Sequence, residues 1–255
     1  MTDLLVASVQ HNVPWAAKEQ IRLFAQNLTD DHELVIVDNS TDHGAAGEIR
    51  DLCTDTGTAY LRVPGPAHEH PDGLNYAVSV FRSLDIHPDV PLVDSPDLRP
   101  LGPARYVGFV DHDLFPVAPA SVIPWIRQAG FFGIGQRHAP TGSRYLKPSF
   151  AFFDREWLRG RPLNFTGIRA AEKADDGDCG SQLGPLFSDD DWTRMAVIEH
   201  GYKQVRDMDD HLQSWGVEVF GDAGEWVHLF NLSRWLAVPD PDGREALVRE
   251  MVEAL

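Results

Sequence analysis

Blocks of hydrophobic and polar positions alternate along the first half of the chain. Apolar runs at 4–10, 33–40 and 59–63 predict strands, and the second reads as a strand covered on both faces. Apolar residues at helical spacing predict helices at 14–28, around 47–53 and at about 74–84. Strands that alternate with helices in this way predict a parallel sheet with right-handed crossovers.

The second half of the chain has a less regular pattern. Residues 86–104 are rich in proline and acidic residues and have neither the helical nor the strand period of apolar positions, which predicts a long surface connection. The remaining expectations are strands at 106–110, 131–136, 149–154, 217–220 and 225–230, helices at 121–128, 189–200 and 243–255, and a loop at 160–184. Together these elements predict an α/β fold, with a mostly parallel sheet flanked by helices and a smaller region after it.

The net charge of the chain indicates which classes of binding partner are unsuitable. The 255 residues carry a formal charge of -17, without the clustered Lys and Arg that a nucleic-acid backbone requires, so we expect no nucleic-acid partner. An acidic protein can still bind an anionic small molecule if a metal ion supplies positive charge. In that case the metal would be essential.

The first residues, the length of the apolar runs and the two cysteines indicate where the protein is located. The first residues, MTDLLVASVQHN, lack the basic leader of a signal peptide, and no apolar run approaches the roughly 20 residues that span a bilayer. Cys53 and Cys179 have no metal-ligand spacing and are expected to be ordinary thiols of a reducing compartment. We therefore expect a soluble, cytoplasmic protein with no transmembrane segment.

Two carboxylates end the strand in YVGFVDHDLFPV. In an extended backbone Asp111 and Asp113 point to the same side while His112 faces away. Mg²⁺ and Mn²⁺ prefer such oxygen ligands, and parallel sheets bind ligands outside the carboxyl ends of their strands. Taken alone, the three-residue pattern is common and is more often a solvated turn, so the segment by itself does not indicate a metal site.

Polar residues follow the neighbouring strands as well. In VIVDNSTD, Asp38 and Asn39 end a strand, where they could bind a ribose or a base edge, or only stabilise a turn. In PDGLNYAV, Gly73 and Asn75 stand at the start of a helix, and Asn75 is either a helix cap or a contact to a nucleotide phosphate.

Taken in order, an N-terminal strand, VIVDNSTD, GLNYAV and FVDHDLFP resemble the donor-binding half of a GT-A glycosyltransferase of the family 2 type, over roughly the first 150 residues. The resemblance implies one GT-A domain over 1–255, with a nucleotide-sugar-binding half at 1–118 and an acceptor-binding half at 119–255. It also implies a nucleotide-diphosphate-sugar donor, an unknown acceptor, and Mn²⁺ or Mg²⁺ held by Asp111 and Asp113. Asn12 and His112 join the donor-binding candidates.

The resemblance extends to three sites in the second half. The segment EWVHLFNLSRW resembles the late histidine segment of these enzymes, so His228 would join the metal shell and Arg234 would contact the donor phosphates. His228 could also be an ordinary strand histidine, and Arg234 a surface salt-bridge residue. For the base of an inverting transfer the resemblance implies Asp178, because DCG in DDGDCGSQLG resembles the Asp-Thr-Gly element of the family, with cysteine in place of threonine. Helix capping explains the acids of the competing segment FSDDDW.

The leading hypothesis is thus a metal-dependent glycosyltransferase, inverting if the resemblance holds. A nucleotidyltransferase would use a similar sheet and metal, but VQHNVPWAAKE lacks its glycine-rich basic loop. A non-catalytic nucleotide-sugar-binding protein of the same fold, or a metal-dependent hydrolase, would also account for the clustered aspartates. The donor sugar, its base and the oligomeric state are open.

Overall fold

The computed structural model describes residues 2–65, 70–84, 101, 103–137, 142, 144–166, 180–196, 198, 200–204, 216–229 and 246. Most of the predicted connection at 86–104 and of the predicted helix at 243–255 lies outside these residues.

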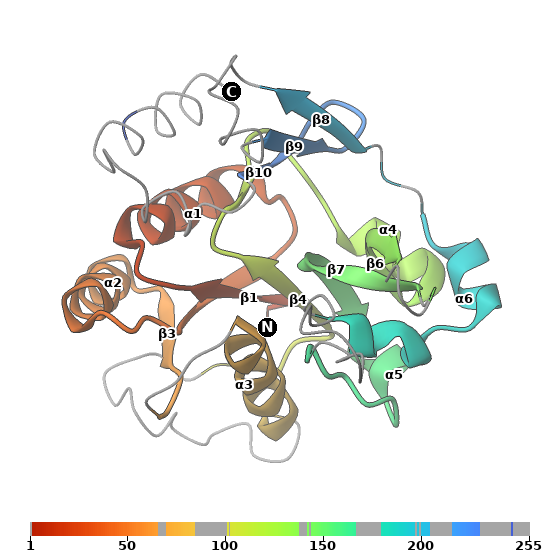
Figure 1. Ribbon diagram of the computed structural model, residues 1–255, viewed down its shortest axis with the longest axis horizontal. Helices are drawn as coiled ribbons and strands as arrows, with labels where there is room; N and C mark the ends of the chain where they lie inside the picture. Colours follow the sequence, from red (N-terminus) through yellow and green to blue (C-terminus); the bar gives the residue numbers. More distant parts are fainter. Residues whose placement is uncertain are drawn as a thin grey trace.

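The main sheet has six strands in the order β3-β2-β1-β4-β7-β6 (Figure 1). Its strands are β1 (Leu4–Gln10), β2 (His32–Asp38), β3 (Ala59–Arg62), β4 (Tyr106–Asp111), β6 (Phe131–Arg137) and β7 (Arg144–Asp154). The first four are parallel, whereas β7 runs antiparallel to both β4 and β6. The predicted fold class, a mostly parallel sheet flanked by helices, is confirmed.

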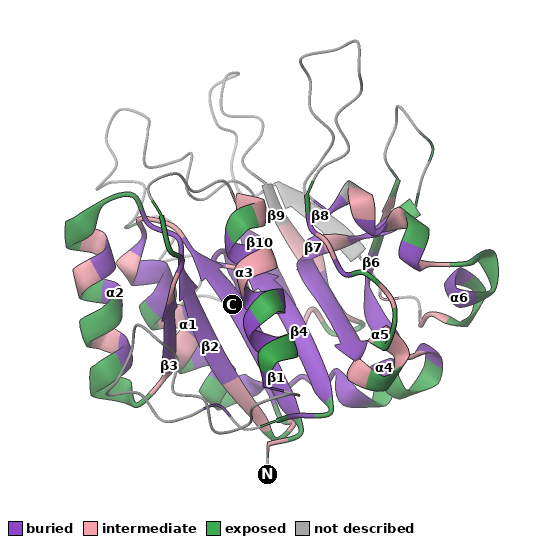
Figure 2. Cartoon of the chain, turned by 90° about the horizontal axis from the view of Figure 1, so that it is seen from below, coloured by how far each residue is buried: buried purple, intermediate pink, exposed green. Residues whose placement is uncertain are grey.

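Helices cover both faces of this sheet. They are α1 (Pro14–Asn27), α2 (His43–Thr56), α3 (His70–Ser83), α4 (Ile123–Ala129), α5 (Arg155–Leu158) and α6 (Asp189–Arg194), with a 3₁₀ helix at Ser181–Leu186. Along β1 the side chains alternate between the faces: Leu5 and Val9 join the core under α3, while Leu4 and Val6 join the core under α1 and α2. Burial on both faces explains why these strands are nearly continuous apolar runs (Figure 2).

A second, antiparallel sheet packs beside α1. Its four strands, in the order β5-β10-β9-β8, are β5 (Leu114–Pro116), β10 (Trp226–Leu229), β9 (Gly216–Phe220) and β8 (His200–Gln204). Phe115 and Val227 pack against Trp15 and Leu23 of the helix. The chain therefore passes from one sheet to the other within the Asp-His-Asp segment, a change that the sequence pattern did not indicate.

Two predicted helix boundaries are wrong. The helix expected at 189–200 ends at Arg194, because Met195 adopts an extended backbone with φ -62° and ψ 132°, and β8 already begins at His200. The helix expected from about residue 74 begins at His70, so Gly73 and Asn75 lie inside α3. Among the described residues, no helix combines the length and apolarity needed to cross a membrane.

Substitution of Gly108 in β4 tests how closely side chains pack against the centre of the main sheet. A Cβ added there would overlap the ring of the fully buried Phe152, whereas a Cβ added at Gly47 on α2 would meet nothing within 4 Å. Gly108→Ala should lower the free energy of unfolding by about 1–3 kcal/mol. Gly47→Ala should raise it by about 0.5–1 kcal/mol. Urea unfolding measures both, and equal effects would contradict this packing.

Candidate functional site

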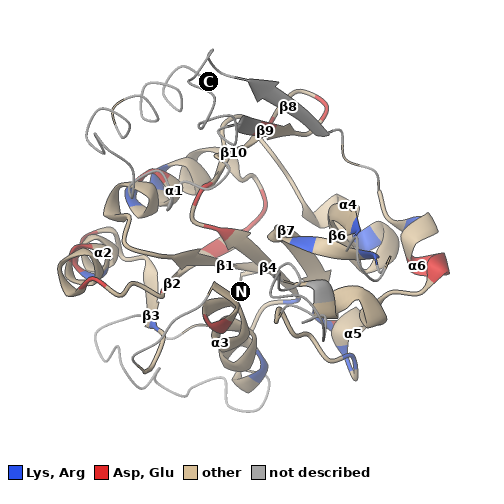
Figure 3. Cartoon of the chain, in the orientation of Figure 1, with Lys and Arg blue, Asp and Glu red and all other residues tan. Residues whose placement is uncertain are grey.

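Three side chains from two distant parts of the sequence meet where the two sheets join. Asp111 ends β4, Asp113 lies in the turn that follows, and His228 lies on β10. One ligand atom from each lies within 4.8 Å of the other two, so the group could hold a metal ion. Figure 3 shows acidic residues on the segment that leaves β4. The structure thus brings the three predicted metal ligands together, and metal binding by them stays a prediction.

The backbone brings the carboxylates together in a different way from the one predicted. The chain is extended only as far as Asp111, turns at His112 and Asp113, and resumes as a strand at Leu114. The turn, and not the alternation of an extended strand, lets Asp113 reach His228 while Asp111 faces α3. There His70 Nε2 lies 2.8 Å from Asp111 Oδ1.

Both ring nitrogens of the buried His228 face carboxylates. Nε2 lies 3.1 Å from Asp113 Oδ1, and Nδ1 lies 2.6 Å from Glu218 Oε2. Burial alone would lower the pKa of His228, but the carboxylates of Asp113 and Glu218 raise it to about 9. Burial alone would raise the pKa of Glu218, but the contacts from His228 and from Lys147 on β7 lower it to about 2.

Glu218 is a site residue that the sequence analysis missed. It pairs with His228 across the antiparallel β9–β10 hairpin, in a register that also pairs Phe220 with Trp226. The turn residues GDAG between two short apolar strands could have indicated this hairpin, and its register would then have placed the glutamate opposite the histidine.

The chemistry of the three donors fits a divalent cation. Two carboxylate oxygens suit Mg²⁺ and Mn²⁺, and an imidazole nitrogen favours a transition metal such as Mn²⁺. Imidazole binds a metal through an unprotonated nitrogen. Because Glu218 favours a proton on Nδ1 of His228, Nε2, which lies beside Asp113, is the nitrogen that would bind a metal in place of its proton.

His112 is the middle residue of the turn and one of the predicted donor-binding residues. Its side chain is buried, and its Nε2 has no hydrogen-bond partner among the described residues. Burial lowers the pKa of His112. The neighbouring carboxylates of Asp113 and Asp111 act in the opposite direction, but their effect is smaller. The ring is therefore neutral near pH 7, and donor binding by this residue stays a prediction.

Three further predicted donor-binding residues lie together at the carboxyl ends of β1 and β2: Asn12, Asp38 and Asn39. Asn12 has a left-handed backbone with φ 57°, and its Oδ1 accepts hydrogen bonds from the N–H groups of Thr41 and Asp42. Asn39 is buried, and its N–H donates to Gln10 O. Together they join the loop after β1 to the loop after β2.

Asp38 is fully buried at the same edge. Its Oδ2 accepts bonds of 2.7 Å from Tyr60 Oη and Arg62 Nη1, and its Oδ1 accepts one from Ser40 N. These bonds stabilise the start of the loop after β2. Asp38 therefore has the turn-stabilising function that the sequence analysis considered beside binding of a ribose or a base edge. Contact with a ribose stays a prediction.

The two predicted residues on α3 have structural contacts of their own. A Cβ at Gly73 would meet Val9 Cγ1 at 2.5 Å, so glycine lets α3 approach the end of β1 closely. Asn75 does not cap the helix, because the helix starts at His70. Its Oδ1 accepts a 2.9 Å bond from Phe165 N, and its Nδ2 donates to Thr166 Oγ1.

Two predicted residues lie outside the described part of the chain: Asp178, the candidate base, and Arg234, the candidate phosphate contact. The competing acidic segment is described. Ser188 and Asp191 form a capping box at the start of α6, which is the explanation preferred for FSDDDW.

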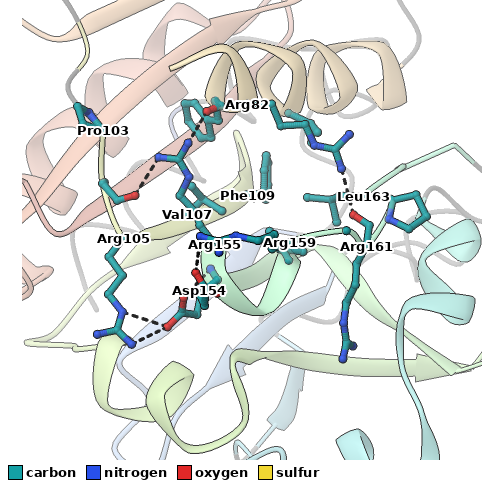
Figure 4. Close-up of a pocket in the computed structure, with 17 residues that line it drawn as sticks. Arg82, Pro103, Arg105, Val107, Phe109, Asp154, Arg155, Arg159, Arg161 and Leu163 are labelled. Carbon is teal, nitrogen blue, oxygen red and sulfur yellow. Dashed lines mark hydrogen bonds and ion pairs between the residues drawn. The ribbon is translucent and has the colours of Figure 1, made fainter. Parts of the chain in front are cut away.

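A cavity of about 1290 Å³ lies elsewhere, between α3, the start of β4 and α5 (Figure 4). Arginines are prominent in its lining: Arg82, Arg105, Arg155, Arg159 and Arg161. Several of them fix the surrounding structure, since Arg105 pairs with Asp154 and Arg155 donates to the carbonyls of Ala104 and Phe81. The lining of the cavity includes none of Asp111, Asp113 and His228, so the cavity is separate from the candidate metal site.

Comparison with known proteins gives likeness in structure only. No protein-family model matches the chain, and no curated protein matches its sequence.

Similar solved structures include a mannosyltransferase from Pyrobaculum calidifontis in complex with GDP-Man and Mn²⁺ (TM-score 0.41, 16% identity, 62% of this chain and 46% of that one). S. aureus TarS matches with a TM-score of 0.41 and 14% identity, over 64% of this chain and 30% of that one. Glucosyl-3-phosphoglycerate synthase from Mycobacterium tuberculosis, in complex with Mn²⁺, UDP and glucosyl-3-phosphoglycerate, matches with a TM-score of 0.39 and 13% identity, over 72% of this chain and 62% of that one.

Each match therefore spans less than two thirds of the similar protein. Glycosyltransferases, the class that the sequence motifs indicated, are among the structures similar to this chain. At TM-scores near 0.4 the likeness adds nothing on substrate or mechanism, which rest on the site itself.

The contact between Glu218 and His228 predicts a pH dependence of the metal-free protein. Because the pKa of His228 is raised from 6.5 to about 9, the stabilisation from its charged form is fully present below about pH 6.5 and is lost as the pH rises through about 9. Glu218→Gln removes one carboxylate, so the titration midpoint of His228, followed by NMR of its ring, should fall toward 6.5. Glu225→Gln, at the hairpin turn, is the control and should leave the midpoint in place. An unchanged midpoint in Glu218→Gln would contradict the assigned contact.

Proposed function

We propose that the chain is a metal-dependent glycosyltransferase of the family 2 type, which moves a sugar from a nucleotide-diphosphate sugar to an acceptor hydroxyl with inversion. The observation that carries the proposal is the meeting of Asp111, Asp113 and His228 at the carboxyl end of β4. In open sheets with parallel strands this edge is where nucleotides bind.

Asp111, Asp113 and His228 would hold Mn²⁺ in preference to Mg²⁺, because the imidazole favours the transition metal. A cation held by these residues would supply positive charge to the departing diphosphate. The protein itself carries -17, so its own surface charge would repel that diphosphate. Glu218 keeps the ring of His228 oriented by its contact with Nδ1.

The donor would lie along the edge formed by the loops after β1 and β2. Asn12 and Asn39 shape these loops, and the predicted contacts of Asp38, Gly73, Asn75 and His112 with the donor belong to the same proposal. Arg234 would contact the diphosphate through its guanidinium.

Transfer needs a base on the side of the anomeric carbon opposite the leaving group. We assign this base to Asp178. It takes the proton of the acceptor hydroxyl as that oxygen forms a bond to the anomeric carbon. The bond from this carbon to the diphosphate oxygen breaks at the same time, and the nucleoside diphosphate leaves with the electron pair.

The test is transfer or donor hydrolysis with a set of nucleotide-diphosphate sugars and Mn²⁺. Asp111→Asn and Asp113→Asn should each reduce turnover at least about 100-fold, because a catalytic metal contributes several kcal/mol and each 1.4 kcal/mol is tenfold in rate. Asp51→Asn, on the exposed face of α2, should match the wild type. Full activity in the double Asp111→Asn, Asp113→Asn variant would overturn the mechanism.

The products distinguish transfer from hydrolysis and from binding alone. Sugar released at a rate that does not respond to any acceptor would indicate a hydrolase. Binding of a nucleoside diphosphate with metal, without any product, would indicate a binding protein.

A further inference from the structure

A buried glutamine of α1 contacts the backbone of the turn that carries the two aspartates. Gln20 is fully buried, and its Nε2 donates to two carbonyl oxygens, at 2.7 Å to Asp111 O and at 2.8 Å to Leu114 O. These carbonyls stand at the two ends of the turn, one at the end of β4 and the other at the start of β5. One side chain therefore spans the whole Asp-His-Asp segment.

The orientation of this amide is fixed by its other end. Gln20 Oε1 accepts hydrogen bonds from Ser8 Oγ at 2.5 Å and from Gln10 Nε2 at 2.6 Å, and Gln10 Nε2 also donates to Ser8 Oγ. Both protons and both lone pairs of the Gln20 amide are therefore used. An inverted amide would direct its oxygen at two carbonyls, so the network allows a single orientation.

The opposite side of the turn is fixed by β10. Leu229 N donates to Asp113 O at 2.8 Å, next to His228 on the same strand. The turn is thus held from α1 through Asp111 and Leu114, and from β10 through Asp113. The bonds from α1 set where the two carboxylates lie relative to the histidine that β10 supplies.

We propose that Gln20 is a positioning residue for the metal site, which with Ser8 and Gln10 fixes the turn so that Asp111, Asp113 and His228 can bind one cation together. This inference rests on the proposed function, because it assumes that the group binds metal. Gln20 itself faces the backbone carbonyls and acts on the cation only through the turn.

The chain offers a matched control for the loss of a buried amide. Asn27 lies two turns further along the same face of α1, is also buried, and its Nδ2 donates at 2.8 Å to Pro116 O at the end of β5. Removal of this bond costs stability in the same way, but the bond lies beyond the turn. A merely structural function of Gln20 predicts that the two positions behave alike.

The experiment measures Mn²⁺ affinity, by electron paramagnetic resonance of the free ion, in folded full-length protein checked by circular dichroism. Gln20→Met should bind Mn²⁺ about 10–100-fold more weakly than the wild type, the loss typical when support for metal ligands is removed. Ser8→Ala keeps both bonds to the carbonyls but loosens the amide, and should weaken binding about threefold, less than the full loss of such support. Asn27→Met should stay within about twofold, because its bond lies outside the metal-binding turn.

The outcomes separate this inference from the proposed function. Tight Mn²⁺ binding by the wild type with equal affinity in folded Gln20→Met would overturn the positioning by Gln20 and leave the glycosyltransferase proposal standing. If Gln20→Met does not fold, Ser8→Ala decides in the same way, and wild-type affinity in that variant overturns the inference. Absence of Mn²⁺ binding by the wild type would overturn both.

Discussion

The structure of the site depends on how a turn holds two carboxylates close together. With ligand atoms of Asp111 and Asp113 within 4.8 Å of each other, two like charges at an effective dielectric constant of about 20 repel by at least roughly 3.5 kcal/mol. Nothing in the two aspartates themselves opposes this repulsion. Hydrogen bonds from α1 and β10 to the carbonyls of the turn hold the backbone, while His70 and His228 contact the carboxylates.

Charge balance around His228 explains why the second sheet belongs to the site. Asp113, Glu218 and His228 are all largely buried, and unpaired buried charges are costly. Lys147 reaches Glu218 from β7 of the main sheet, so it joins the two sheets at the level of the histidine. A cation bound between Asp111 and Asp113 would complete the balance, which makes this corner of the fold favourable for a metal.

The sequence predicted the strands of the main sheet well, but only two of the four strands of the second sheet, β9 and β10. The strands β1 to β4 are buried on both faces, and each stands out as an apolar run with polar residues after it. β5 has three residues and directly follows a turn, so no period could identify it. Asp189 to Arg194 begins with a strong capping box, but nothing in the pattern indicated that Met195 would become extended.

The same limit applies to the site residues. Asp111 and Asp113 could be predicted because two carboxylates at the end of a strand match the chemistry of a metal, and His228 because the segment EWVHLFNLSRW resembles a histidine segment of known glycosyltransferases. Gln20 and Asn27 could not, because helix patterns are recognised from apolar residues, and these two polar side chains occupy the buried face of α1 beside Phe24. Ala25 of the same helix, although apolar, is exposed.

Buried amides on a helix face have a physical reason in this fold. The chain leaves the main sheet after β4, so the carbonyls of Asp111 and Leu114 cannot both be satisfied by neighbouring strands, and each unsatisfied buried carbonyl would cost about 1–3 kcal/mol. An apolar side chain at position 20 would fill the space and leave both carbonyls without a donor. The polar residue on α1 is therefore a consequence of the turn that brings Asp113 to His228 of β10. The same change of sheet brings the candidate metal ligands together and creates the need to satisfy the carbonyls of the turn.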